Sequence, residues 1–361
     1  MTIKTRTTES ATAPVRSRQP LAGQDRRSFL KALGLLAFAP PALAQSPTPV
    51  AVRKIHSFDI KVTDVARALQ FYQDLLGAPI QARRGEQVFL RVGEGPRFFS
   101  LSPVGAGEQP GFSYIGLSVA NFEADRVQSQ LEAFGIRKAA APDSLADRLA
   151  VASTSWIEQH GATRELFFAD VEGIIYHLSS ENYCAGGGVL GEDCTAAEPA
   201  PVDGMFELVD YSHFTNFMAN RDRANEFYTR AFGKTFQVYQ GPLSPVIGVG
   251  DGIQFLMYVG GDAPGTPESP GNINHVSFSV TNFDVDTILA QLTDYGLSAR
   301  ENSNDNRPMQ HWISMRMPNR GGAQGGTPEL YFSDPDGIRI QLQDPGYCGG
   351  AGYLGDVCPP L

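Results

Sequence analysis

Apolar and polar residues alternate along much of the chain, and the period of the pattern changes at regular intervals. Phe58, Ile60 and Val62 are apolar at a spacing of two, which predicts a β-strand with one buried face. Apolar residues then recur at helical spacing between Asp64, a residue type that caps helix N-termini, and Gly77, which is suited to a C-cap. Strand, helix and two or three further strands follow one another four times, which predicts an α+β fold.

This plan is present twice. Three segments of the first half match three segments of the second half in the same order, and the pairs end at Gly77 and Gly233, at Gly135 and Gly296, and at Leu178 and Leu342. A fixed order over more than a hundred residues indicates a tandem duplication in which only the loops differ in length. We therefore predict two domains, residues 54–194 and 207–358, joined by a polar, Pro- and Ala-rich linker at 195–206.

These motifs together resemble the vicinal oxygen chelate superfamily of glyoxalases, bleomycin-resistance proteins and extradiol dioxygenases. Each half has a strand, a capped helix with a Phe-Tyr pair and a closing Gly, and the second half has an Asp-Pro-Asp-Gly turn at 334–337. The resemblance covers residues 54–183 and 207–345 and implies tandem domains built from four βαβββ units, whose sheets curl around a cleft. It leaves the activity open, because the superfamily contains both metal enzymes and metal-free binding proteins.

The first 44 residues have the features of an export signal. Arg26 and Arg27 precede a short apolar run, and Ala-Leu-Ala ends at Ala44 before Gln45. This order predicts a twin-arginine signal peptide, with Asp25 where Ser or Thr is usual. A membrane anchor is the alternative, but about eight apolar residues before a Pro pair are too few to cross roughly 30 Å of hydrocarbon. We expect the twin-arginine export machinery as a partner, and a periplasmic or secreted mature protein without a membrane segment.

The charge of the mature chain narrows the choice of ligand. Removal of residues 1–44 takes seven Lys or Arg from 29 and two Asp or Glu from 39, which leaves a net charge of 22 − 37 = −15. Such an acidic chain without a basic run argues against nucleic acid and anionic lipid as partners. A neutral or cationic small-molecule substrate, or a metal cation, is more compatible with it.

All four cysteines lie in two matched tails. Cys184 and Cys194 enclose nine residues, as do Cys348 and Cys358. Of the three possible connectivities, the repeat favours two local disulfides, which an oxidising compartment would permit. A metal site of four thiolates is the rival interpretation, although the spacing is too wide for Cys-x2-Cys ligand pairs.

The two halves allow an internal comparison, in which a residue present in one half alone is a candidate for a functional site. In metal-binding members of the superfamily the ligands come from the first strand of a unit and from the strand after the late turn. The resemblance places His213, His275 and Gln341 at these positions, whereas the first half has Ser57, Tyr114 and His177. Each histidine alone could equally be an ordinary hydrogen-bonded residue of a strand.

Gln341 departs from the family pattern. Extradiol dioxygenases, as a class, use two histidines and one glutamate of their second domain, and a neutral amide is a weaker ligand than a carboxylate. Glu329 is the nearest acid in sequence, but Glu165 occupies the same place in the first half, which favours a structural role. His56 is displaced by one residue from the ligand position, so strand alternation would turn it to the other face. The first domain is therefore predicted to be non-catalytic.

The segment from Arg300 to Gly326 is predicted to be about eight residues longer than its counterpart. Its polar and aromatic residues favour a loop that covers a ligand, although a disordered Gly-rich loop is the alternative. His311 within it is a candidate acid or base.

Two functions are compatible with these residues. The first is a metal-dependent enzyme that acts on a small substrate with adjacent oxygen atoms. Its divalent cofactor would be iron(II) if the protein is extradiol-dioxygenase-like, with manganese, nickel or zinc as alternatives, the last two in a glyoxalase-like lyase or isomerase. The second is a metal-free periplasmic protein that binds or sequesters a small molecule.

Overall fold

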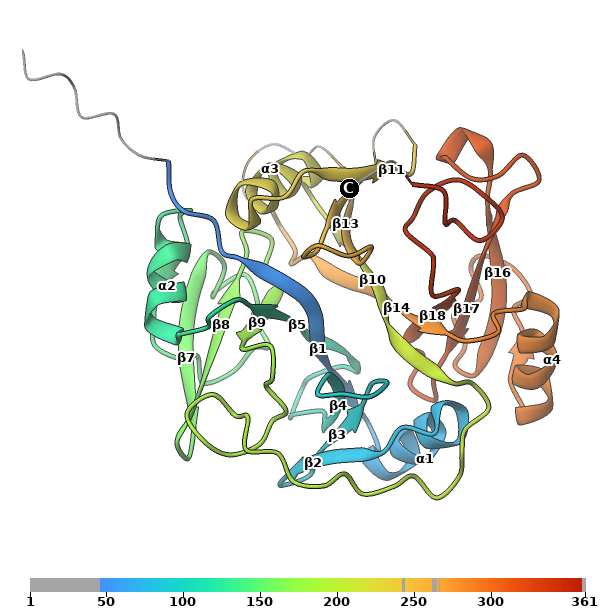
Figure 1. Ribbon diagram of the computed structural model, residues 1–361, viewed down its shortest axis with the longest axis horizontal. Coiled ribbons are helices and arrows are strands. Elements are labelled where there is room, and N and C mark those ends of the chain that lie inside the picture. The colour runs from blue at the N-terminus through green and yellow to red at the C-terminus, as the bar shows by residue number, and fades with distance from the viewer. Residues whose placement is uncertain (1–45, 242–243, 262–264, 266, 359–361) are drawn as a thin grey trace, which may run out of the picture. The chain divides into compact units, whose positions relative to one another are not determined.

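The computed structural model describes residues 46–361 except 242–243, 262–264, 266 and 359–361. The predicted signal peptide, residues 1–44, lies outside these residues. Residues 47–361 form one compact unit, shown in Figure 1. In the described part of the chain, no helix has the length and apolarity needed to cross a membrane.

The first repeat has nine strands and two helices among the described residues. They are β1 (Val52–Val62), α1 (Val65–Leu76), β2 (Ile80–Arg84), β3 (Gln87–Arg91), β4 (Phe98–Pro103), β5 (Gly111–Val119), α2 (Ala124–Glu132), β6 (Arg137–Lys138), β7 (Thr154–His160), β8 (Thr163–Ala169) and β9 (Ile175–Ser179).

The second repeat has the same succession of elements, with one added 3-10 helix. They are β10 (Leu208–Met218), α3 (Arg221–Phe232), β11 (Phe236–Tyr239), β12 (Pro245–Gly248), β13 (Phe255–Gly260), β14 (Asn272–Val280), α4 (Val285–Tyr295), β15 (Ser298–Ala299), β16 (Gln310–Arg316), η1 (Pro318–Arg320), β17 (Thr327–Ser333) and β18 (Arg339–Gln343).

Each repeat forms its own sheet, and the two sheets have the same topology. The strand order is β2-β3-β4-β1-β5-β9-β8-β7-β6 in the first and β11-β12-β13-β10-β14-β18-β17-β16-β15 in the second. A repeat is thus two βαβββ-like units joined through β1 and β5, or through β10 and β14. The two-residue strands β6 and β15 are additions to this plan. The predicted α+β architecture of four units is confirmed.

The helix ends follow from local chemistry at most of the predicted positions. Asp64 and Asn220 accept the backbone N–H three residues ahead, as N-caps do. Gly77 and Gly233 end α1 and α3 in the left-handed region, with φ of 58° and 64°. Helix α2 is the exception, because its C-cap is Ala133 in a right-handed conformation and the predicted glycine lies two residues beyond it.

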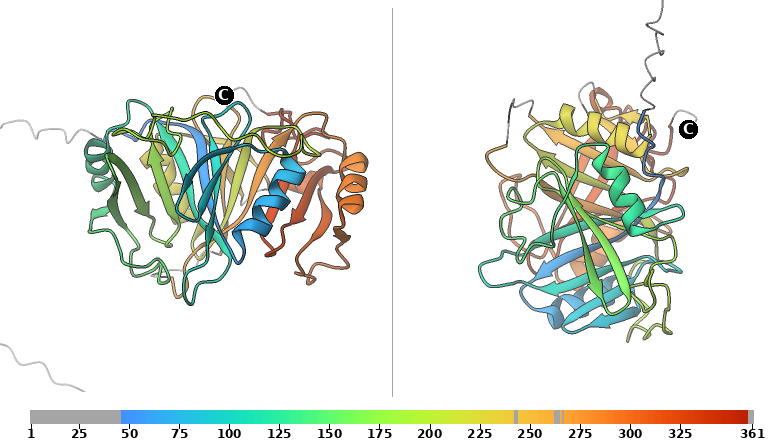
Figure 2. Two further views of the ribbon diagram at one scale, coloured as in Figure 1. Left: turned by 90° about the horizontal axis from the view of Figure 1, so that it is seen from below. Right: turned by 90° about the vertical axis from the view of Figure 1, so that its left-hand side faces the viewer.

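The first helix of each repeat contacts the other repeat. Tyr72 on α1 donates to Asp334 in the late turn of the second repeat at 3.0 Å, and Tyr228 on α3 donates to Asp170 in the first repeat at 2.9 Å. One hydrophobic cluster contains buried residues of both repeats. Helices α2 and α4, in contrast, lie at opposite ends of the unit (Figure 2). The two repeats therefore pack together within one compact unit.

Candidate metal centre

Three adjacent strands of the second sheet carry the residues proposed as ligands. His213 on β10 and Gln341 on β18 both lie opposite Ser277 of the intervening strand β14, and His275 lies two residues from Ser277 on that strand. Because side chains two residues apart share a face, the three side chains converge. The two imidazole centroids are 5.5 Å apart with their planes at 83°. All three residues line a cavity of about 280 Å³.

The environment of the two imidazoles keeps them neutral. Burial lowers the pKa of His275 to about 3 and that of His213 well below its usual value, and the nearby Gln341 amide opposes both shifts only in part. Nδ1 of His275 lies 2.9 Å from Oδ1 of Asn274, which also accepts a hydrogen bond from Arg339 at 2.8 Å. Since that oxygen can only accept, Nδ1 of His275 donates the proton and its Nε2 keeps a lone pair.

Several buried polar atoms around this cavity have no hydrogen-bond partner among the described residues. They are Nε2 of His275 and both amide atoms of Gln341. An unpartnered buried polar atom is costly, so a group that binds here would relieve the cost. Two neutral imidazoles and an amide oxygen can coordinate a divalent cation, and an imidazole held by an outer hydrogen bond is common at metal sites. The residues fit a metal ion.

The donor set nevertheless lacks an anion. Within the described residues, no group of three or more His, Cys, Asp or Glu side chains is placed to hold a metal. Glu329 lines the cavity, but its carboxylate accepts from Arg316 at 3.0 Å and from the Tyr347 hydroxyl at 3.2 Å. The corresponding Glu165 is paired with Arg84 at 2.8 Å in the first repeat. Both glutamates thus have the structural role that the internal comparison predicts.

The arrangement of most of the chain is similar to that of known ring-cleaving enzymes. A variant of homoprotocatechuate 2,3-dioxygenase from Brevibacterium fuscum superposes with a TM-score of 0.54 at 18% identity, covering 82% of this chain and 73% of that one. The anaerobic complex of that enzyme with 3,4-dihydroxyphenylacetate gives a TM-score of 0.53 at 17% identity, with 82% of each chain covered. The fold is the tandem vicinal oxygen chelate fold.

A room-temperature structure of an extradiol ring-cleaving dioxygenase from B. fuscum is similar to the same degree, with a TM-score of 0.54 at 18% identity over 86% of this chain and 75% of that one. No family sequence model matches the chain. No curated protein matches it in sequence. At such low identity the likeness establishes the vicinal oxygen chelate fold and leaves the chemistry to the site.

The equivalent place in the first repeat is filled by aromatic rings. His177 stacks on Phe167 with centroids 4.8 Å apart, and the rings of Tyr114 and Tyr183 lie 5.6 and 5.1 Å from it. Ser57, at the first-strand position, lies against Gly116, where even a Cβ atom would collide with its hydroxyl. The vicinal oxygen chelate plan thus places the converging histidine pair in the second repeat.

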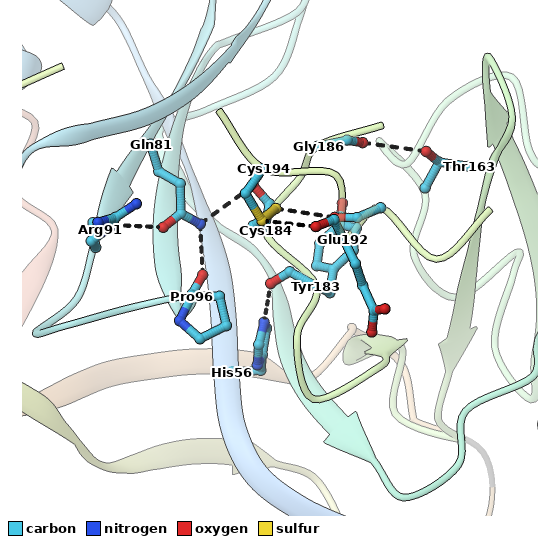
Figure 3. Close-up of a disulfide and its surroundings, with 11 residues drawn as sticks. His56, Gln81, Arg91, Pro96, Thr163, Tyr183, Cys184, Gly186, Glu192 and Cys194 are labelled. Carbon is cyan, nitrogen blue, oxygen red and sulfur yellow. Dashed lines mark hydrogen bonds between the residues drawn. A yellow bond between two sulfur atoms is a disulfide. The ribbon is translucent and has the colours of Figure 1, made fainter. Parts of the chain in front are cut away.

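His56 does not face away from this aromatic cluster, so the prediction for it was wrong. Its Nε2 donates to the carbonyl oxygen of Tyr183 at 2.6 Å, and its ring lies 6.2 Å from that of Tyr183, which His177 also contacts. Figure 3 shows the His56 hydrogen bond beside the Cys184–Cys194 disulfide. The physical reason is a register shift between Ile55 and Ser57, which interrupts strand alternation.

His311 does not lie in the cavity, so its assignment as acid or base is corrected. It is buried, and its Nε2 lies 2.9 Å from the hydroxyl of Thr293 on α4. Its neighbour Trp312 lines the cavity instead. Strand alternation on β16 sends the two side chains to opposite faces, and His311 belongs to the helix side.

Within the segment from Arg300 to Gly326, the extra residues lie in one hairpin. The β16–β17 turn spans residues 317–326, whereas the β7–β8 turn has only residues 161–162, so eight residues are added there. The loop before β16 is shorter by five, since Trp312 corresponds to Trp156 while Gly296 corresponds to Gly135. The segment from Arg300 to Gly326 is therefore longer by three overall, not by eight. Arg320 of the hairpin lines the cavity.

Three arginines that sequence reasoning missed also line the cavity: Arg300, Arg320 and Arg339. The guanidinium groups of Arg300 and Arg339 lie 4.7 and 5.5 Å from the centroid of Trp312. The site is thus cationic although the chain as a whole is acidic. A cationic small-molecule substrate, which the net charge of the chain allowed, does not fit the arginines of this cavity.

Proposed function

We propose that the mature protein is a metal-dependent enzyme of the vicinal oxygen chelate type that acts on a small substrate with adjacent oxygen atoms, with an extradiol-dioxygenase-like reaction as the preferred form. The observation that supports this most is the convergence of His213, His275 and the unpartnered Gln341 amide on one cavity. The shared fold with dioxygenases supports the choice of reaction.

In this proposal the protein's own residues bind and orient. His213 and His275 would hold a divalent ion, iron(II) first and manganese, nickel or zinc as alternatives, with the oxygen of Gln341 as a third ligand. Such an ion supplies Lewis acidity to a chelating substrate. Asn274 fixes the His275 ring, and Trp312 and Tyr331, with ring centroids 5.4 Å apart, add aromatic surface to the cavity.

A metal-free binding protein is the second candidate, and Gln341 is the observation that favours it. A neutral amide leaves the full charge of a cation uncompensated, and the surrounding arginines would repel it. The same cavity could then sequester a small molecule without turnover.

Elemental analysis of the mature protein purified from the periplasm tests the first proposal against the second. We expect a stoichiometric divalent metal that is lost with chelator, and oxygen uptake when the iron-loaded protein is given 3,4-dihydroxyphenylacetate. If the purified protein holds no metal, and the Gln341→Glu variant takes up none of iron, manganese, nickel or zinc, the binding protein replaces the enzyme. Metal without oxygen uptake would exclude the dioxygenase form and leave a lyase or isomerase.

We also propose that the chain reaches the periplasm by the twin-arginine route and begins at Gln45 when mature. The disulfides Cys184–Cys194 and Cys348–Cys358 support an oxidising destination. Replacing Arg26 and Arg27 by Lys should leave the precursor in the cytoplasm, which fractionation and immunoblotting would detect. Undiminished export of this variant would contradict the route.

A further inference from the structure

The residues around the candidate metal centre supply no net negative charge to compensate a bound cation. An imidazole that binds a metal is neutral and the Gln341 amide carries no charge, so the three ligand positions supply no negative charge. Among the described residues that line the cavity, Glu329 is the single acid, and the buried guanidinium of Arg316 already neutralises it. Three further guanidinium groups face the same space.

These arginines are special to the second repeat. The backbone N–H of Arg300 bonds His311 as that of Ala139 bonds Ser155, so Arg300 corresponds to Ala139. Arg339 pairs with Ser333 as Ile175 pairs with Ala169. Arg320 lies in the β16–β17 turn, which is eight residues longer than the corresponding turn of the first repeat. The first repeat thus lacks all three arginines together with the histidine pair, which indicates that the arginines belong to the site and not to the fold.

None of the three arginines is neutralised by a described residue, and two of them, Arg300 and Arg339, are held in place by hydrogen bonds. In the described part of the chain none of the three is ion-paired with a carboxylate. Arg339 donates to Asn274, and Arg300 donates to the carbonyl oxygens of Ser303 and Asp305. Carbonyl and amide oxygens fix a guanidinium group but leave its charge for an incoming anion. A guanidinium fork matches the two oxygens of a carboxylate.

We propose that this cavity binds a divalent cation and a small oxyanion, a carboxylate first, as a coupled pair, with Arg300, Arg320 and Arg339 holding the anion. The inference rests on the proposed function, because it takes the metal site at His213 and His275 as given. The incoming anion supplies the negative charge that Gln341 does not. The bound anion then reduces the repulsion between the arginines and the cation, and the bound cation attracts the anion in turn.

Coupling of this kind is reciprocal, so it can be measured from either side. We would titrate chelator-treated mature protein with Mn²⁺ by calorimetry, alone, with saturating benzoate and with benzamide as a neutral analogue. We expect benzoate to tighten Mn²⁺ binding by about 5- to 150-fold, a usual range for coupled sites, and saturating Mn²⁺ to tighten benzoate by the same factor. Benzamide should have little effect.

Three variants separate the contributions. Arg320→Gln and Arg339→Gln should each weaken benzoate binding and, because a repelling charge is removed, strengthen Mn²⁺ binding when benzoate is absent. Gln341→Glu should bind Mn²⁺ tightly without benzoate and show a smaller coupling. Arg83→Gln serves as the control, since this exposed arginine pairs with Glu198, does not line the cavity and should behave as the wild type. Thermal melts would show that each variant folds.

Equal Mn²⁺ affinity in benzoate, benzamide and buffer would overturn the coupling while leaving the metal site intact. So would a coupling that survives unchanged in both arginine variants, or the absence of benzoate binding. Failure of the proposed function looks different, because neither the wild type nor Gln341→Glu would then bind Mn²⁺ under any of these conditions.

Discussion

At the scale of single residues, the site depends on imidazoles that are buried without becoming charged. His213 stacks on Phe255 at 4.4 Å and on Tyr347 at 5.5 Å, which excludes water from one ring. His275 is oriented by Asn274. Ordinary hydrogen bonding does not account for the burial of both imidazoles, because Nε2 of His275 has no partner among the described residues.

We therefore predict that His213→Ala and His275→Ala each lower metal content strongly. Changes to outer-shell partners alone reduce metal affinity about 10- to 100-fold, and loss of a direct ligand should cost at least as much. Metal per protein after dialysis measures the effect. His177→Ala is the matched control, since both of its ring nitrogens are also buried without partners, but in the repeat that lacks the pair. An equal loss of metal in His177→Ala would contradict the assignment.

The family resemblance pointed to the histidine pair and Gln341 in the sequence, and the register of three adjacent strands brings them together in the structure. It missed the arginines, because arginine is a residue type usually found at the surface. A signal did exist, since the first half has Ala139 and Ile175 at the positions of Arg300 and Arg339. His56 could not have been placed, because a bulge does not show in an alternating pattern.

At the scale of elements, the two cysteine tails have the same covalent form and different neighbours. Each disulfide joins residues ten apart, as predicted, and a loop of this size contributes about 3 kcal/mol in the chain-entropy model. The residue before Cys348 is Tyr347, which stacks on His213, whereas the residue before Cys184 is Tyr183, which packs in the aromatic cluster of the first repeat.

Cys348→Ser and Cys184→Ser should thus lower the free energy of unfolding by similar amounts, about 3 kcal/mol each. Only Cys348→Ser should also weaken metal binding, because it loosens Tyr347 beside His213. Urea unfolding and metal titration of both variants would measure the two effects. Equal metal affinity in the two variants would show that the tail does not support the site.

The turn before β9, which begins at Asp170, and the turn before β18, which begins at Asp334, make the stability of the protein depend on pH. Burial raises the pKa of Asp170 and of Asp334 to about 7, although backbone N–H groups and a tyrosine hydroxyl donate to each carboxyl. In the unfolded chain both would titrate near 3.8. The folded state therefore holds extra protons between these values, and the stability present below about pH 4 is lost as the pH rises toward 7.

The double variant Asp170→Asn and Asp334→Asn should make the free energy of unfolding less dependent on pH between about 4 and 7. An amide keeps an acceptor for the backbone N–H groups and cannot ionise, so up to about 4 kcal/mol of pH-dependent loss per carboxyl should disappear. Denaturant midpoints at pH 4, 5.5, 7 and 8 would measure the difference. Parallel profiles for wild type and variant would mean that these carboxyls ionise in the folded state as they do in the unfolded one.

The elements themselves were largely predictable, since caps and two-residue alternation are local. The caps of α1 and α3 form as predicted, because one residue decides each cap: Asp64 and Gly77 for α1, Asn220 and Gly233 for α3. Which repeat a helix packs against was not predictable from such patterns. The contacts of Tyr72 with Asp334 and of Tyr228 with Asp170 join residues about 262 and 58 positions apart.

At the scale of the whole molecule, each repeat packs a helix against the other repeat. Phe71 of α1 packs on Phe332 of the second sheet, and Arg223 of α3 pairs with the fully buried Glu172 of the first repeat at 2.6 Å. Separating the repeats would expose apolar rings and leave a buried carboxylate without its cation. Breaking a buried ion pair in this way costs about 3–5 kcal/mol.

We therefore predict that the mature chain unfolds in one transition and that neither repeat folds alone. Calorimetry should give a calorimetric enthalpy equal to the van't Hoff enthalpy for the whole chain, as expected when no intermediate is populated. A fragment of residues 46–206 should lack a cooperative melt, because α1 would lose the surface on which Phe71 packs. Tyr72→Phe and Tyr228→Phe each remove one cross-repeat hydrogen bond and should lower the single transition without splitting it. Two resolved transitions, or a cooperative melt of the fragment, would show that the repeats are independent domains joined by a linker.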